Sequence, residues 1–232
     1  GSHAPVSGNS FTIITTTTGV SGTFSGLADG ATVLLNSQPL EIDYQANAVV
    51  LTFDASPVIN ASVGNNAITV REDASGNIEV VVDGVTVFDT PLSSLAGLTI
   101  NGSDGNDTLT VDYSAAGGFF NLPITFTGGN PSAAAGDSLI INDAPGTATT
   151  ITHTFANAND GSVNIDGTVI TYTGLEPVTD NLAATDRVFT FTGGAETITL
   201  TDATSSAMTI GSTLGESVTF ATPTGSLTIN AG

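Results

Sequence analysis

The residues best suited to chemistry in this chain lie in one short run of acidic, amide and glycine residues, at positions 102–110. Asp104, Asn106 and Asp107 offer carboxylate and amide oxygens, which are the hard ligands that calcium prefers. The glycines of the run permit tight turns in which backbone carbonyls also point inward. Asp112, a little further on, is a lesser candidate. The sequence predicts no certain cofactor; calcium is the candidate that this run offers, with Asp104, Asn106, Asp107 and Asp112 as its ligands.

The run also matches the calcium-binding nonapeptide Gly-Gly-x-Gly-x-Asp-x-Leu-x, with Ser103 in place of the second glycine. Proteins with that nonapeptide build each site from two stacked copies. The only second candidate here is the poorly matching segment 193–198. Two interpretations therefore stay open: a calcium site, and a structural corner whose aspartates are solvated.

Enzymatic chemistry has little support among the remaining residues. His153, the only histidine outside the N-terminal tripeptide, lies in a Thr-rich run, and we expect it at the surface. Arg187 follows Asp186, and we expect a local ion pair or an edge position. A Ser-His-Asp hydrolase would need a Gly-x-Ser-x-Gly elbow, which the chain lacks. Cys and Lys are absent, which excludes thiol, Schiff-base and P-loop chemistry. The sequence therefore predicts a protein that is not an enzyme.

The charge balance excludes several partners. The chain has 22 Asp and Glu against two basic residues, Arg71 and Arg187, for a net charge of -20. Such a chain cannot neutralise phosphates or anionic lipid heads, so we expect neither nucleic acid nor membrane partners. No stretch reaches the roughly 18 apolar residues of a membrane span. The acidity favours a salty or calcium-rich extracellular medium, where ions screen the self-repulsion.

Alternation of apolar and polar residues is the main structural signal. Short runs rich in β-branched and aromatic residues are bounded by Gly, Asn, Asp or Pro, which predicts strands between turns. No window shows a helical period. The predicted strands include 31–35, 49–53, 78–82, 85–88, 108–113, 138–141, 169–172, 188–191 and 197–201.

A unit of strand, glycine corner, acidic residue and second strand recurs at irregular spacing, over 98–112, 124–143 and 188–202. In a parallel β-solenoid each unit is part of a coil, whereas in an antiparallel β-sandwich it is a hairpin. The short Thr-rich strands and uneven loops favour the solenoid, and the sandwich is the alternative. Asp83-Gly84, Asp160-Gly161 and Asp166-Gly167 predict tight hairpins or corners.

Residues 1–3 are interpreted as the remnant of an expression tag. We expect residues 4–232 to form a single elongated β-solenoid fragment, with a subdivision near 54–66. The final residues, 227–232, have the shape of another repeat beginning.

Three segments resemble large repetitive secreted proteins of bacteria, especially those of planctomycetes. The first spans 22–33 and continues through 42–44 and 47–52; it is similar to β-helical passenger and adhesin repeats, with their glycine-rich turn shortened to 45–48. The second is 97–112, and the third is 170–178. The resemblance implies a right-handed parallel β-helix, export, and a role at the cell surface or in a matrix.

Together these patterns predict a non-enzymatic structural or adhesive segment of a larger extracellular bacterial protein, acting as a rigid scaffold or surface-interaction module. The expected partners are neighbouring repeats, a second copy bound end to end, and a cell-surface or glycan ligand. Alternatives are a calcium-binding β-roll-like module that folds with metal, and a polysaccharide-acting β-helix enzyme. Thr at alternate strand positions also suggests an ice- or mineral-binding face, although that needs regular Thr-x-Thr ladders and the irregular repeat argues against them.

Overall fold

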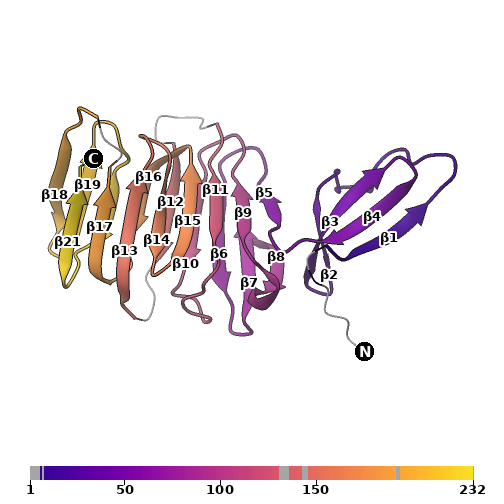
Figure 1. Cartoon of the computed structure of the whole chain (residues 1–232), viewed down its shortest axis with the longest axis horizontal. Helices are drawn as coiled ribbons and strands as arrows, with labels where there is room; N and C mark the ends of the chain where they lie inside the picture. The colour runs from indigo at the N-terminus through magenta and orange to yellow at the C-terminus, as the bar shows by residue number, and fades with distance from the viewer. Residues whose placement is uncertain (1–5, 7, 131–135, 143–145, 192–193, 232) are drawn as a thin grey trace.

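A computed structural model describes residues 6, 8–130, 136–142, 146–191 and 194–231. The tripeptide interpreted as a tag remnant lies outside these residues, as do Asp143 and Gly193 of the predicted repeats. The described chain is all β apart from one 3₁₀ turn, Leu92–Ser94, so the all-β prediction is confirmed. Its strands form three sheets, and the first and last strands lie near opposite ends of the long axis (Figure 1).

Sheet A is a four-stranded antiparallel sheet near the N-terminus, set apart at one end of the molecule (Figure 1). It has a small core of its own, made by Leu40, Ile42, Val49 and Leu51. The segment that resembles adhesin coils therefore forms antiparallel strands, because two-residue turns connect its strand 32–35 to 38–45 and 38–45 to 48–53. The strands are β1 (Ser10–Thr15), β2 (Thr32–Leu35), β3 (Gln38–Gln45) and β4 (Ala48–Phe53), in the order β1-β4-β3-β2.

Sheets B and C face each other across one continuous hydrophobic core. In order across sheet B lie β21 (Ser226–Asn230), β17 (Ala184–Thr190), β13 (Ala148–Phe155), β14 (Gly161–Ile165), β15 (Thr168–Thr173), β11 (Ile124–Thr127), β9 (Leu98–Asn101) and β5 (Val58–Asn60). In order across sheet C lie β18 (Ile198–Thr204), β19 (Ala207–Ser212), β20 (Val218–Ala221), β16 (Leu175–Asp180), β12 (Asp137–Asn142), β10 (Thr108–Asp112), β6 (Ala67–Glu72), β7 (Asn77–Val82) and β8 (Val85–Pro91).

The chain crosses repeatedly from sheet B to sheet C, and its crossing strands pair with their equivalents in parallel register. Equivalent residues consequently stack in columns through the core. In sheet C one such column is Ile68, Leu109, Leu139, Val178 and Val218, all buried. The two large sheets are mixed but largely parallel. Strands that pair in parallel need long connections between them, and the crossings between sheets B and C provide these connections.

Hairpins interrupt the parallel pairing at three places. β7 and β8 turn at Asp83-Gly84, and β14 and β15 turn at Asp166-Gly167, with positive φ at all four turn residues. These two dipeptides therefore make hairpins, because their φ values match the twist of the flanking strands. At the third place β18, β19 and β20 pair antiparallel in succession at the other edge of sheet C, and β6–β7 and β13–β14 are antiparallel pairs as well.

The third predicted repeat takes a different course from the first two. Its strand, β18, pairs only with β19, antiparallel, at the edge of sheet C, and Asp202 is exposed there. The position next to β16 is taken instead by β20, which Glu216 precedes by two residues. The inserted hairpin moves the acidic corner residue from Glu196 to Glu216.

Candidate functional site

The predicted calcium run forms a corner between β9 and β10. We use the word coil for one passage of the chain through sheet B and then sheet C, and neighbouring coils supply partners for the polar groups of this corner. The Asn130 side-chain amide donates to Asp104 Oδ1 at 3.0 Å, and the Asn106 backbone N–H donates to Asn65 Oδ1 at 2.9 Å. Asp107 is fully buried, and its Oδ1 accepts from the Asn66 backbone N–H at 2.7 Å. The three predicted ligands therefore make contacts from coil to coil.

Asp112 lies at the far end of β10 from this corner, where its Oδ1 accepts hydrogen bonds from Ser114. The structure does not bring it together with Asp104, Asn106 and Asp107. Among the described residues, no group of three or more His, Asp or Glu side chains is placed to hold a metal ion. The calcium site stays a prediction from the motif.

Buried carboxyls at successive corners are a feature that the motif did not reveal. The Asp107 backbone N–H donates to Asp137 Oδ1 at 2.7 Å, so the contact from Asn66 to Asp107 is repeated one coil further on. Asp107 Oδ2, Asp137 Oδ2 and Glu216 Oε2 are buried without a hydrogen-bond partner among the described residues. We call Asp107, Asp137 and Glu216 the corner carboxyls.

Glycines of the facing corner make room for these side chains. A Cβ on Gly102 would lie 2.6 Å from Asp107 Oδ2, and a Cβ on Gly128 would lie 2.4 Å from Asp137 Oδ2. Any larger residue would push the carboxyl out of the corner. This contact explains the recurring unit of glycine corner followed by acidic residue: the glycine is needed because the acid packs against it.

Burial sets the protonation of the corner carboxyls. Burial raises the pKa of Asp107 and of Asp137 above the usual range, against the opposing effect of a backbone N–H bond to each. Burial, together with the charge of Glu176, raises the pKa of Glu216 to about 7. Folding therefore favours the protonated form of these groups, and stability is lost as pH rises through their folded pKa values.

We expect the Glu216→Gln variant to gain stability over the natural chain as pH rises. The unfolded carboxyl ionises near pH 4.5 and the folded one near 7, so the natural chain loses stability between these values while the variant does not. The difference in free energy of unfolding should grow by about 2–3 kcal/mol between pH 5 and pH 8. Urea unfolding at several pH values measures it. Glu41→Gln, at an exposed carboxyl, should show no such growth, and a parallel rise there would refute the assignment.

A buried ionic cluster lies between the two sheets, made by His153 of β13, Asp180 of β16 and Arg187 of β17. All three side chains are 0% exposed. His153 Nε2 lies 3.0 Å from Asp180 Oδ2, and Arg187 donates to Asp180 Oδ2 and to the Leu182 carbonyl. The sequence expectation of a surface His153 and of a local or edge Arg187 is wrong.

Physical surroundings fix the charge state of this cluster. Burial raises the pKa of Asp180, but the hydrogen bond from His153 and the charge of Arg187 hold it below the usual range. Burial lowers the pKa of His153, which favours the neutral ring, and in that form Nε2–H donates to the carboxylate. The ring also stacks on Phe189 with centroids 4.9 Å apart. Because the three groups are fully buried, they cannot reach a substrate, and their role is to join the sheets.

The sequence did contain a signal for this cluster. His153 lies two residues from Ile151 and from Phe155, and Arg187 lies two residues from Phe189, so strand alternation places both on the apolar face. Asp180 lies two residues from Val178 in the same way. The position of a residue in the inward–outward alternation of its strand was a better guide to its burial than its own polarity.

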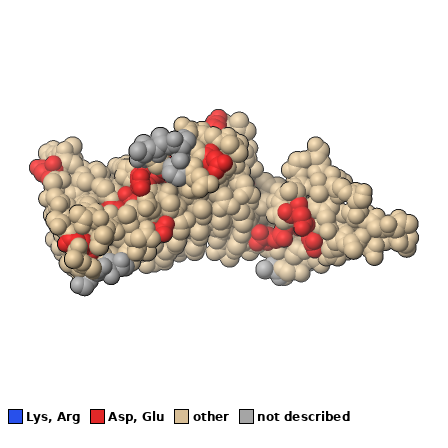
Figure 2. Space-filling model, turned by 90° about the horizontal axis from the view of Figure 1, so that it is seen from above, with Lys and Arg blue, Asp and Glu red and all other residues tan. Residues whose placement is uncertain are grey.

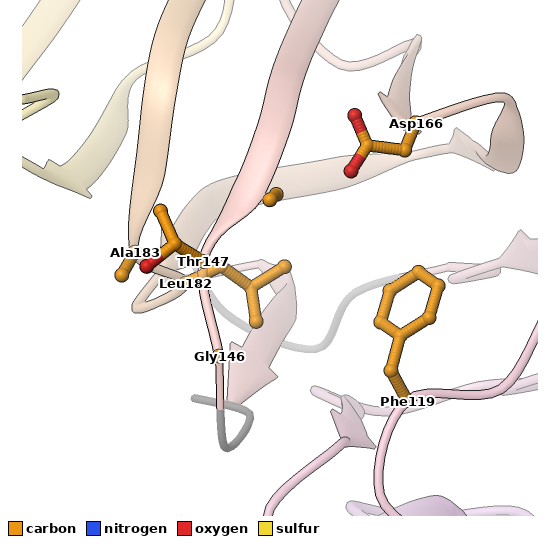
Figure 3. A pocket seen from close by; sticks show the side chains of 7 residues that line it. Phe119, Gly146, Thr147, Asp166, Leu182 and Ala183 are labelled. Carbon is orange, nitrogen blue, oxygen red and sulfur yellow. The ribbon is translucent and has the colours of Figure 1, made fainter. Parts of the chain in front are cut away.

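A shallow hollow of about 200 Å³ lies beside the start of β13. Phe119 and Asp166 lie on one side of it, and Thr147, Leu182 and Ala183 lie across from them (Figure 3). Both carboxylate oxygens of Asp166 accept backbone N–H bonds, from Thr149 and Thr150. The one acidic side chain in the hollow is therefore engaged in holding a hairpin.

The other arginine is also engaged. Arg71 Nε donates to Glu79 Oε2 at 2.8 Å across the antiparallel pair of β6 and β7. No helix of the described chain has the length and apolar character to cross a bilayer. Comparison with protein-family models, with curated proteins and with solved structures gives no match.

Proposed function

We propose that this chain is a non-enzymatic structural and adhesive segment of a larger extracellular bacterial protein, built as a parallel β-solenoid. The observation that carries the proposal is the stacking of equivalent residues in parallel register. Leu98, Ile124 and Ile170 stack in sheet B as the column through Leu109 does in sheet C. Each coil thus buries the core of the next, and such a stack makes a rigid spacer.

Two further features support a structural role over an enzymatic one. A lyase acting on an acidic polysaccharide needs a free cation, but Arg71 is paired with Glu79 and Arg187 is buried. The net charge of -20 would also repel a polyanionic substrate. The same charge favours an exported protein in a medium of high ionic strength, where screening reduces self-repulsion.

The open end of the stack supports the proposed contact with neighbouring repeats or a second copy. β21 pairs with β17 on one side only, and Ile229 stacks beyond Phe189 as the last member of a core column. Ile229 is 38% exposed, and Leu200 and Leu214 towards the same end are also exposed. An edge strand with exposed apolar residues is a template for another chain.

We expect the natural chain to associate end to end at high protein and salt concentration, and Ile229→Glu to abolish this association. The added carboxylate would bring like charges together at the end of the core column. Sedimentation velocity over a concentration series measures it, with Thr228→Glu on the outward side of the same strand as the matched control. A natural chain that stays monomeric throughout contradicts end-to-end association.

A further inference from the structure

The outward side chains of sheet B form an ordered row of hydroxyl and amide groups. Thr99, Thr125 and Thr171 are neighbours in parallel register. The row continues across the hairpin strands and ends at the last strand of the sheet. In order it contains Thr99, Thr125, Thr171, Ser162, Thr154, Thr190 and Asn230. We call this row, together with the other outward side chains on the strands of sheet B, the hydroxyl face.

Register produces this row where sequence spacing does not. Loops of unequal length separate the contributing strands, so no regular repeat is visible in the chain. A second row, Asn60, Asn101, Thr127 and Thr173, runs beside the first. Thr125-x-Thr127 and Thr171-x-Thr173 are therefore equivalent pairs on neighbouring parallel strands. Two adjacent rungs of the Thr-x-Thr ladder that an ice- or mineral-binding face requires are therefore present in the fold, and Thr99-x-Asn101 extends them.

The hydroxyl face is almost free of charge in a chain of net charge -20. Among its described positions on the strands of sheet B, Asp186 is the one carboxylate, and it accepts a hydrogen bond from the Ser226 hydroxyl at 2.6 Å. Figure 2 shows acidic side chains gathered in several separate patches along the molecule. The scarcity of charge on the hydroxyl face favours an uncharged partner, because a cationic partner would bind more strongly to the acidic surfaces elsewhere on the molecule.

The face is both accessible and rigid. Thr125, Thr127, Thr171 and Thr173 are exposed, whereas the inward residues between and beside them are fully buried. Strand geometry spaces the exposed groups about 4.8 Å apart across strands and about 6.6 Å apart along them. β-Branched threonines keep few rotamers, so the array loses little entropy when it binds.

These properties select a partner that is itself periodic, neutral and hydrogen-bonding. No outward residue described on the strands of sheet B is aromatic, so the stacking platform of a typical sugar site is missing. Each threonine instead presents a methyl group, which orders adjacent water, and a hydroxyl group, which bonds to it. We propose that the hydroxyl face binds ice, with ordered water held by many equivalent weak contacts at once. This proposal rests on the register of sheet B and is independent of export and of end-to-end association.

The test is adsorption of the purified full chain to a growing ice surface. We expect the fraction taken up by ice to be well above that of an inert acidic protein. Thr171→Tyr should lower this fraction by about tenfold, because one protruding ring near the middle lifts neighbouring threonines off the surface and the contacts act together. Thr125→Tyr should do the same, and it decides the outcome if the first variant does not fold.

The matched control is Thr110→Tyr, the same substitution on a central strand of sheet C, where the outward threonine row is interrupted by Ile140 and flanked by the charged Arg71 and Asp112. It should leave ice uptake unchanged, and far-UV circular dichroism should show all variants folded. Exclusion of the natural chain from ice overturns the proposal, as does equal loss in the Thr110→Tyr variant. Binding to insoluble cellulose or chitin, in place of ice and lost with Thr171→Tyr, would assign the face to a polysaccharide and also overturn it.

Discussion

Replacing Asp180 by alanine should lower the free energy of unfolding by about 3–5 kcal/mol, one of the two largest effects of a single substitution that we expect. Asp180 is the shared partner of His153 and Arg187, and it also accepts the Leu182 backbone N–H at 3.0 Å. Its removal leaves the guanidinium in an apolar core without a counter-charge. Urea unfolding measures the loss.

Two further variants separate this explanation from a general effect of losing an aspartate. Asp202→Ala, at an exposed position of β18, should change stability by less than about 0.5 kcal/mol. The triple variant D180L/H153F/R187M replaces the whole cluster by apolar side chains and keeps a ring beside Phe189. It should recover most of the loss, because an apolar replacement of a buried ion pair is often neutral or stabilising. A triple variant less stable than D180A would contradict this account.

Replacing Gly129 by alanine should cost about 4 kcal/mol or more. A Cβ at this position would lie 1.7 Å from the backbone oxygen of Ser103, in the neighbouring coil. That oxygen cannot move away freely, because it accepts the Asn130 N–H at 3.1 Å. The substitution would therefore force two coils apart at the corner. Thermal and urea unfolding measure the loss of stability.

Gly84→Ala is the matched control for backbone strain. Gly84 also has positive φ, +81° against +111° for Gly129, but a Cβ there would meet nothing within 4 Å. Strain alone should cost about 1–2 kcal/mol at Gly84. Equal losses in the two variants would mean that coil-to-coil contact at Gly129 contributes nothing.

Several parts of the fold could be predicted from local sequence because they depend on local physics. Asp83-Gly84 and Asp166-Gly167 specify hairpins, since few other dipeptides accept positive φ at both positions. The alternation of apolar and polar residues specified the strands. Because His153 and Arg187 lie two positions from apolar residues of their strands, it also specified their burial. The recurring glycine and acid of 98–112 and 124–142 correctly indicated equivalent corners.

Other parts could not be read locally. The hairpin of β18 and β19 shifts the corner acid to Glu216, although residues 188–202 follow the shared pattern. Strand pairing there depends on which neighbour buries more apolar surface, which a single segment does not determine. The calcium motif also could not be interpreted from local sequence alone. Its glycines and aspartates suit a turn equally well whether the aspartate oxygens face a metal ion or the backbone of the next coil.

The sequence by itself determined that this chain is an acidic all-β protein of short, turn-bounded strands, because alternation, turn residues and charge are properties of neighbouring residues. Tertiary structure alone decided which strands lie side by side. Through that choice it aligned the threonines of sheet B, buried Asp180 between His153 and Arg187, and placed carboxyls against glycines from other strands. Contacts between residues far apart in the chain form only when coils stack in register, and loop lengths in the sequence do not reveal that register.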